Sequence, residues 1–363
     1  MKTHRLAIVG TGNSVGNHLA AIGALKDRVK LVAAVDLDEN RVRSICEEHG
    51  IPRYYTRLSE MLSAEAPDLV SVVTPPATHK AISIECLEAG SWVYCEKPLC
   101  GSLADFDEIQ QAEARSGRYV STVFQWRFGS AGKHLKQLLQ NQALGRPLVA
   151  VCNTLWYRTQ AYYDVEWRGK FETEFGGPTM TLGIHLMDLL LWLMGDWQEV
   201  HAMTGTLDHD IEVEDVSMAI VRFQDGTMGS IVNSVLSPRQ ESYLRLDFQK
   251  ATIEVSTLYR YGNEHWKISL PPQVDEPEIL HIWNGQKENR ASSHDVQLGE
   301  ILDSMEANQR PPVSGDEARR IIEFTASVYK SAFSGKPVQK GEITPDDAYY
   351  YANNGAVEMQ SRS

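Results

Sequence analysis

Apolar residues in the first third of the chain alternate between short continuous runs and stretches with helical spacing. Continuous runs of valine, isoleucine and leucine are typical of parallel strands that are buried on both faces. Such runs occur at residues 6–9, 30–36, 68–76 and 91–96. Each is followed by a segment in which apolar residues recur every three or four positions, as in an amphipathic helix. This alternation predicts a doubly wound parallel α/β sheet.

Beyond this part the pattern changes to longer strands with some alternation of polar and apolar positions. The predicted strands cover residues 147–158, 217–223, 227–236 and 243–248. Asp225-Gly226 predicts a hairpin between two of them. Further along the chain, residues 274–293 are predicted to form a long loop. Amphipathic helices are predicted near 294–308 and 316–333. We therefore expect two domains, residues 1–123 and 124–363.

Composition and charge narrow the function classes. The 363-residue chain is 42% hydrophobic and 23% charged, as in ordinary soluble globular proteins. Its formal net charge of −13 argues against nucleic-acid or anionic-membrane partners, because both require a basic surface. No secretory signal is evident, and the apolar stretch at 189–194 is too short to cross a bilayer. Five cysteines without metal or disulfide spacing indicate reduced, mostly buried thiols in a cytoplasmic protein, and we expect no metal.

A glycine-rich turn separates the first predicted strand from the first helix. Gly10 and Gly12, with Gly16 one residue later than in the usual pattern, would let backbone N–H groups approach a pyrophosphate. Asp36 ends the second strand, where a carboxylate can bind both ribose hydroxyls of an adenosine. Leu37 follows it instead of a residue that would bind a 2′-phosphate, so NAD(H) is favoured over NADP(H). The alternatives are a tight turn without a ligand and an aspartate that only neighbours a helix N-cap.

A glutamate and a lysine stand side by side at the end of the run at 91–96. Glu96 and Lys97 precede Pro98, which cannot continue the strand ladder. Ligands of open α/β sheets bind beyond the carboxyl ends of the strands. Beside an oxidised nicotinamide, the pKa of Lys97 would fall from ~10.4 toward the range where it can exchange a proton with an alcohol. Glu96 would hold the ammonium or bind a ribose hydroxyl; the alternative is a buried ion pair at a domain hinge.

The apolar segment that begins at Pro178 predicts a helix. On an α-helix, Thr181, His185, Asp188 and Trp192 would fall on one face. Polar residues on an otherwise apolar helix need hydrogen-bond partners. Asp188 could therefore be bonded locally, whereas His185 is a candidate for chemistry.

Four segments together resemble the glucose–fructose oxidoreductase / inositol dehydrogenase / MocA (Gfo/Idh/MocA) family: AIVGTGNSVGNHLAAI, VAAVDLD, DLVSVVTPPATHKAISIECLEAGSWVYCEKPL and GGPTMTLGIHLMDLLLWLMG. The resemblance implies an N-terminal Rossmann domain and a C-terminal α/β domain with a large, mostly antiparallel open sheet. It also implies hydride transfer to or from a sugar, a polyol or a sugar derivative. Lys97 matches the catalytic lysine, and His185 matches the histidine that acts with it on the reacting hydroxyl. A cis peptide before Pro98 is a further implication.

The resemblance and the strand ends together give the residues that we expect at the site. The expected cofactor-binding residues are Gly10, Gly12, Asn13, Ser14, Val15, Asp36, Thr74, Pro75, Pro76, His79, Glu96, Lys97, Gln125, Trp167 and Arg168. The expected substrate-binding residues are Lys97, Arg127, Tyr163, Thr181 and His185. Arg158 and Tyr162, together with Tyr163, would either contribute a cation and hydroxyls to a sugar pocket or pack within a loop.

The chain departs from the family at one position. Inositol dehydrogenase and its close relatives have an aspartate one helical turn before the histidine, where this chain has Thr181. A threonine can hydrogen-bond an imidazole but cannot stabilise an imidazolium as a charge would. Either Lys97 is the main acid/base and His185 a positioning donor, or the reaction is not ordinary alcohol oxidation.

The function that we expect is an NAD-dependent oxidoreductase acting on a hydroxyl of a sugar, a sugar derivative or a cyclic polyol. One alternative is an oxidation–elimination enzyme that retains its NAD and cleaves a glycosidic or other leaving group. Another is a non-catalytic NAD or sugar sensor. The expected partner is a small carbohydrate or polyol, with no nucleic acid and no membrane. Apolar residues on both alternating sets of the strands at 217–223 and 227–236 favour a homodimer or homotetramer.

Overall fold

The computed structural model describes residues 3–272 and 277–356, which form two units. The units consist of Met1–Val123 with His294–Arg319 (unit 1) and of Phe124–Ser293 with Arg320–Ser363 (unit 2). The first division falls after Val123, where we expected it. The expected second domain is not continuous, however, because the chain returns to unit 1 at His294.

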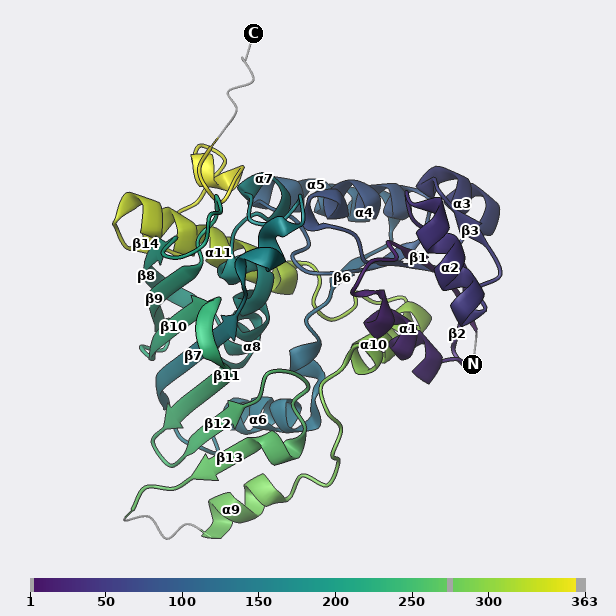
Figure 1. Cartoon of the computed structure of the whole chain (residues 1–363). Helices are drawn as coiled ribbons and strands as arrows, with labels where there is room; N and C mark the ends of the chain where they lie inside the picture. The colour runs from purple at the N-terminus through teal and green to yellow at the C-terminus, as the bar shows by residue number, and fades with distance from the viewer. Residues whose placement is uncertain (1–2, 273–276, 357–363) are drawn as a thin grey trace. The chain divides into compact units, whose positions relative to one another are not determined.

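Unit 1 is built on a six-stranded parallel sheet in the order β3-β2-β1-β4-β5-β6 (Figure 1). Its strands are β1 (His4–Val9), β2 (Val29–Val35), β3 (Tyr54–Tyr55), β4 (Leu69–Val72), β5 (Trp92–Cys95) and β6 (Val120–Thr122). Its helices are α1 (Val15–Ala24), α2 (Glu39–His49), α3 (Leu58–Glu65), η1 (Pro76–Thr78), α4 (His79–Glu88), α5 (Leu103–Ser116) and α10 (His294–Ala307). The predicted doubly wound sheet is confirmed.

Helix α10 explains why the chain returns to unit 1. Helices α1 and α10 pack together on one face of the sheet, and α4 and α5 pack together on the other (Figure 1). Leu298, Ile301 and Leu302 of α10 are fully buried in one cluster with Leu6 and Ile8 of β1. Without α10 this apolar surface would face water, at a cost of roughly 25 cal/mol for each Å² exposed.

Unit 2 contains an eight-stranded sheet in the order β13-β12-β11-β7-β10-β9-β8-β14. Its strands are β7 (Pro147–Tyr157), β8 (Trp197–Gly205), β9 (Val216–Phe223), β10 (Met228–Ser234), β11 (Leu236–Phe248), β12 (Thr252–Ser256), β13 (Trp266–Ser269) and β14 (Val338–Gln339). The pair β7–β10 is parallel and the other pairs are antiparallel. Strands β9 and β10 form the predicted hairpin at Asp225-Gly226, where Gly226 has φ +88°.

The helices of unit 2 differ from the predictions at two places. They are η2 (Gln125–Phe128), α6 (Ser130–Gln140), η3 (Gln160–Asp164), α7 (Phe171–Glu174), η4 (Thr179–Gly183), α8 (Ile184–Met194), η5 (Asn263–His265), α9 (Pro277–Asn284), α11 (Asp316–Ser334, beginning in unit 1) and η6 (Ala348–Tyr350). The long loop predicted over 274–293 is wrong at α9, a short helix whose Ile279 is buried; residues 273–276 lie outside the described part. The helix predicted from Pro178 begins with a π-helical turn, η4, before the α-helix α8.

Helix α8 is a core helix. The stretch Phe171–Met194 is long and apolar enough to cross a membrane, but 78% of its apolar 18-residue window is buried inside the protein. Helix α8 packs against β7 and β11 on one face of the large sheet. Its apolar composition is therefore accounted for by the core.

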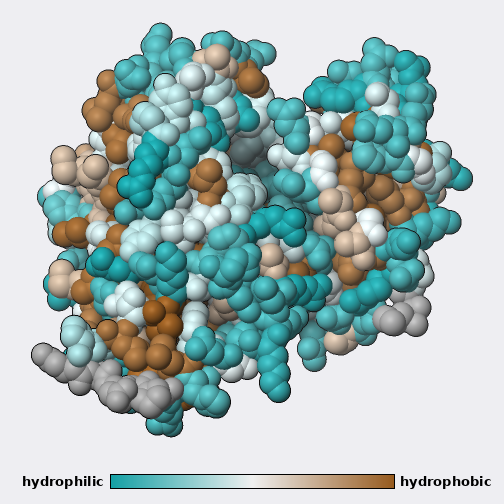
Figure 2. Space-filling model, turned by 60° about the horizontal axis from the view of Figure 1, so that its bottom comes forward, coloured by the Kyte–Doolittle hydropathy of each residue, from teal (hydrophilic) through white to brown (hydrophobic). Residues whose placement is uncertain are grey.

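The opposite face of the large sheet presents apolar side chains to solvent. We call this surface the exposed sheet face; it consists of Val149, Met203, Met218, Ile220 and Met228, and the last four are 54–75% exposed. Met203 lies opposite Met218 in the β8–β9 ladder, so both point to the same side. In the space-filling view, apolar side chains reach the surface in several places between hydrophilic ones (Figure 2).

Candidate active site

The expected site residues are distributed over both units. Unit 1 contains Gly10, Gly12, Asn13, Ser14, Val15, Asp36, Thr74, Pro75, Pro76, His79, Glu96 and Lys97. Unit 2 contains Gln125, Arg127, Tyr163, Trp167, Arg168, Thr181 and His185. In unit 1 they follow the carboxyl ends of β1, β2, β4 and β5. These strands are consecutive neighbours in the sheet, in the order β2-β1-β4-β5, and the direction of the chain order reverses between β1 and β4. This reversal is where open α/β sheets bind their ligands.

The turn after β1 combines a glycine that is required by the backbone with two glycines that border open space. Gly10 has φ +94°, and an added Cβ would meet the carbonyl oxygen of Val73 at 2.5 Å, so only glycine fits there. An added Cβ at Gly12 or Gly16 would meet no atom within 4 Å. Open space therefore borders the turn where α1 begins at Val15, which fits the pyrophosphate of NAD.

Asp36 is an ionised carboxylate at the end of β2. Its Oδ2 accepts hydrogen bonds from the backbone N–H (2.8 Å) and the hydroxyl (2.7 Å) of Thr11, and its Oδ1 accepts from the N–H of Asp38 (3.0 Å). Burial raises the pKa of Asp36, but these hydrogen bonds outweigh it and hold the pKa below its ordinary value. The carboxylate thus ties the glycine-rich turn to the end of β2.

His79 joins two loops of unit 1. Its buried ring lies between the carbonyl oxygens of Thr74 (2.8 Å) and Pro98 (2.7 Å), so it bridges the loop after β4 and the loop after β5. Burial lowers the pKa of His79, and the two carbonyl hydrogen bonds oppose that shift. The histidine expected at the cofactor therefore supports the loops on either side of it. The predicted cis peptide between Lys97 and Pro98 is present.

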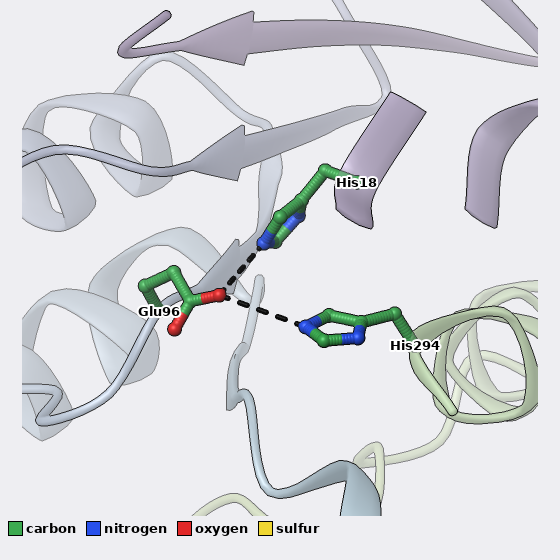
Figure 3. Close-up of side chains that lie close together, drawn as sticks. All are labelled: His18, Glu96 and His294. Carbon is green, nitrogen blue, oxygen red and sulfur yellow. Dashed lines mark hydrogen bonds and ion pairs between the residues drawn. The ribbon is translucent and has the colours of Figure 1, made fainter. Parts of the chain in front are cut away.

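Glu96 is held by two histidines from distant parts of the sequence (Figure 3). Its Oε1 lies 3.0 Å from Nε2 of His18 in α1 and 3.7 Å from Nε2 of His294 at the start of α10. The other ring nitrogen of His18 lies 2.6 Å from the hydroxyl of Ser71 in β4. A neutral His18 satisfies both contacts by donating to Glu96 and accepting from Ser71.

The charges in this cluster follow from its burial and its hydrogen bonds. Burial raises the pKa of Glu96, but the two histidines outweigh it and hold the pKa well below its ordinary value. Burial lowers the pKa of His18. Glu96 is therefore fixed and ionised, and its Oε2 accepts a hydrogen bond from the backbone N–H of Lys97 at 3.2 Å. The three side chains also have the donor set of a metal site, and we assign them the positioning of Glu96 because the hydrogen bonds account for their arrangement.

His185 in unit 2 is packed between aromatic rings. Its side chain is 5% exposed; the ring of Trp126 stacks on it at 5.0 Å and that of Phe124 meets it edge-on at 5.9 Å. Asp188, one turn later in α8, forms a buried ion pair with Arg127 in the segment that carries Trp126. Arg127, expected at the substrate, is thus 3% exposed and bound to Asp188.

Thr181 lies in the π-helical turn that precedes His185. Its hydroxyl donates to the carbonyl oxygen of Gly177 at 3.0 Å. The same turn is fixed by Glu214, which accepts from the N–H groups of Gly177 (2.9 Å) and Thr179 (3.2 Å). The π turn replaces the first turn of the predicted α-helix in front of His185.

The remaining expected residues lie in the loop after β7 and in η2. Arg168 stacks on Trp167 (4.6 Å) and on Tyr162 (3.8 Å), and Tyr163 meets Tyr162 edge-on. Gln125 is 3% exposed. The hydroxyl of Thr173 donates to the carbonyl oxygen of Trp167 at 2.6 Å, so this loop is internally bonded.

Three residues that sequence reasoning did not assign to the site are His18, His294 and Trp126. His18 lies two residues after Gly16, at the start of α1. Its closeness to the glycine-rich turn is a sequence signal that could have indicated its place at the site. His294 is distant in sequence, and only the packing of α10 on α1 brings it to Glu96. Trp126 lies between two expected site residues, Gln125 and Arg127, but nothing in the sequence indicates that its ring stacks on His185.

Comparison with known proteins agrees with this arrangement. Residues 4–124 match the family model of the "Oxidoreductase family, NAD-binding Rossmann fold". Residues 133–255 match the family model of the "GFO/IDH/MocA C-terminal domain". The chain belongs to the Gfo/Idh/MocA oxidoreductase family. This family assignment makes the chain an NAD-dependent oxidoreductase, as the sequence predicts.

Individual members of the Gfo/Idh/MocA family match along almost the whole chain. An inositol 2-dehydrogenase/D-chiro-inositol 3-dehydrogenase of Shouchella clausii is 30% identical over 98% of this chain and 99% of its own length. A D-apiose dehydrogenase of Paraburkholderia graminis is 25% identical over 98% and 95%. The WlbA dehydrogenase of Chromobacterium violaceum, solved in complex with NADH and UDP-GlcNAcA, has a TM-score of 0.81 and 30% identity, covering 93% of this chain and 96% of its own.

Proposed function

We propose that Lys97 exchanges the proton of the reacting hydroxyl and that His185 binds the same oxygen. In this way the enzyme transfers a hydride between nicotinamide and a hydroxyl of a sugar, a sugar derivative or a cyclic polyol. The observation that carries the proposal is the place of Lys97. It directly follows a fixed, ionised Glu96 at the carboxyl end of β5, in the unit whose strand ends also carry the glycine-rich turn and Asp36.

The residues of unit 1 supply the binding and orientation that this chemistry needs. The turn from Gly10 to Val15 would hold the pyrophosphate, and Asp36 would accept the ribose hydroxyls, which favours NAD over NADP. NAD, when bound, supplies the hydride acceptor. Glu96 fixes the backbone of Lys97, and His79 fixes the loop that follows it. Gln125, Trp167 and Arg168 are proposed to contact the nicotinamide end.

The residues of unit 2 supply a rigid donor for the substrate. The ring of His185 is fixed by Trp126 and Phe124, so it loses little freedom when it binds a hydroxyl. A positioned acid/base such as Lys97 contributes about 10²–10⁴-fold to a rate. Thr181 and Tyr163 remain proposed substrate contacts.

A second reaction class is favoured by one observation. The position of the family aspartate is occupied by Thr181, whose hydroxyl donates to the carbonyl oxygen of Gly177 just before the π turn. Without a carboxylate there, an imidazolium at His185 is less stabilised, which suits a proton donor more than a base. An enzyme that oxidises a sugar carbon transiently and then eliminates a leaving group would use this arrangement with a resident NAD.

The assembly and location follow from two further features. The exposed sheet face is apolar over several strands, which favours its burial in a homodimer or homotetramer. The five cysteines are free and buried, as predicted, which supports a cytoplasmic location.

The test is a screen for NADH formation at 340 nm with NAD and a panel of sugars, inositols and sugar acids. Lys97→Met should lower turnover by at least ~10²-fold while NAD still binds. Lys30→Met, a change of an exposed lysine in the same unit, is the matched control. Substrate breakdown without net NADH would favour the elimination reaction, and unchanged turnover in Lys97→Met would contradict the role of Lys97.

A further inference from the structure

Arg158 is a partly buried cation, and no described carboxylate supplies its counter-charge. It follows strand β7 and its guanidinium donates to the carbonyl oxygen of Tyr157 at 2.8 Å. Among the described residues, no carboxylate forms an ion pair with it. Burial lowers the pKa of Arg158, and only the hydroxyl groups of Tyr163 and Tyr259 oppose that shift. Removing a charge from water without a partner costs free energy, so such a residue is retained where something else supplies the opposite charge.

Other arginines with little solvent exposure in unit 2 have that partner. Arg127 is paired with Asp188, and Arg168, whose side chain is 18% exposed, lies 3.7 Å from the carboxylate of Glu174. Arg158 therefore differs from these two arginines, because the fold already neutralises their charge.

Aromatic rings hold the guanidinium of Arg158 in place. It lies over the ring of Trp156 at 5.0 Å and over that of Tyr162 at 5.1 Å. Arg168 lies over the same Tyr162 ring at 3.8 Å, so two cations share one aromatic platform. Stacking leaves the edge of a guanidinium, which carries its N–H donors, available for a planar anion.

A chain of ring contacts links Arg158 to His185. Trp126 stacks on His185 and meets Tyr259 at 6.2 Å, and Tyr259 meets Trp156 at 5.9 Å. Trp156 is the ring on which Arg158 stacks. Tyr259 is 46% exposed, so this aromatic row borders solvent. A molecule bound along it would extend from His185 toward the cation.

We propose that Arg158 binds an anionic group of the substrate, a carboxylate or a phosphate, and that the enzyme therefore acts on acidic sugars. The proposal rests on the proposed function in that it places the substrate on the side of unit 2 that carries His185. A charged hydrogen bond of this kind is bidentate when the geometry allows, which would fix the sugar as well as attract it.

Binding, measured by titration calorimetry on the NAD-saturated protein, tests the proposal without requiring turnover. The probes are glucose, glucuronate, glucose 6-phosphate and UDP-glucuronate. Wild-type protein should bind at least one of the three anions at least tenfold more tightly than glucose, and that preference should fall as KCl is added. Glucuronate and glucose 6-phosphate distinguish a carboxylate from a phosphate as the group that is recognised.

Three variants assign the preference to Arg158. Arg158→Gln should lose the preference for the anion, Arg158→Lys should keep part of it, and Arg239→Gln, which changes a side chain that is 86% exposed, should keep all of it. An unaltered melting temperature of Arg158→Gln shows that the fold is intact.

The proposal is wrong if the anions bind no more tightly than glucose in the wild type, whether both bind or neither does. It is also wrong if Arg158→Gln retains the preference. Failure of the proposed function would appear separately, as absence of NADH formation and of substrate breakdown while anion binding persists.

Discussion

Replacement of Asp188 by asparagine tests the buried ion pair beneath His185. The side chains of Arg127 and Asp188 are only 4% and 1% exposed, so the pair is almost completely removed from water. Asparagine keeps the size of Asp188 and removes its charge, which leaves the guanidinium of Arg127 buried without that counter-charge. Breaking a buried pair in this way costs about 3–5 kcal/mol.

The same reasoning predicts a small loss of stability when a carboxylate near the surface is neutralised. Asp196 binds Arg320 at 2.7 Å and Lys340 at 2.9 Å, but these side chains are 27–30% exposed. Solvent screens such pairs, and their loss costs about 1 kcal/mol or less. Asp196→Asn is therefore the control for Asp188→Asn.

Urea unfolding followed by tryptophan fluorescence is the assay, because every tryptophan except Trp92 lies in unit 2. The double variant Arg127→Met with Asp188→Leu removes both charges and should recover most of the lost stability, since a buried pair replaced by apolar residues is often neutral. The reasoning is refuted if Asp188→Asn costs no more than Asp196→Asn, or if the double variant is less stable than Asp188→Asn.

Three further predictions concern the cofactor, pH and assembly. Asp36→Ala should weaken NAD binding by about 1–3 kcal/mol in titration calorimetry, because a charged hydrogen-bond partner is lost, whereas Asp38→Ala should not; equal dissociation constants would remove Asp36 from the site. Burial raises the pKa of Glu214 above its ordinary 4.5, so the stability that this group contributes is fully present below pH 4.5 and is lost as pH rises through the folded pKa. Glu214→Gln should flatten that part of the melting-temperature profile, and an unchanged profile would contradict it. Ile220→Lys should dissociate the proposed oligomer in light scattering, in contrast to Leu207→Lys, which also changes an exposed apolar residue; an unaltered mass would exclude the exposed sheet face as the interface.

The sequence was most informative where a single strand end carries the chemistry. Gly10, Asp36 and Lys97 were recognised because the carboxyl ends of parallel strands gather at one edge, and the structure has these strands as neighbours around the order reversal. Helix boundaries were informative for the same local reason: Asp38 caps α2 through a hydrogen bond to the N–H of Arg41. Such signals depend on residues that are close in the sequence.

Partners that are distant in the sequence could not be predicted in the same way. A glutamate beside a lysine suggests a local ion pair. In the structure the carboxylate of Glu96 contacts the rings of His18 and His294, which α1 and α10 bring to it. The π turn at Thr181 is held by Glu214, a residue from another segment. Its carboxylate accepts hydrogen bonds from the N–H groups of Gly177 and Thr179. Periodicity alone assumes an α-helix throughout and therefore does not predict the π turn.

These distant partners decide what each charged residue can do. A carboxylate that is already hydrogen-bonded twice, as Glu96 is, has a fixed charge and a fixed position, so it suits the orientation of a neighbouring group more than proton transfer. An arginine that is paired inside the fold, as Arg127 is, has its charge neutralised before any ligand arrives. Arg158 differs because, among the described residues, aromatic rings lie against it and no carboxylate pairs with it, so the proposed anion would recover the free energy of its partial burial. The same residue type thus has a structural role at Arg127 and the proposed binding role at Arg158, and the difference lies in the partner.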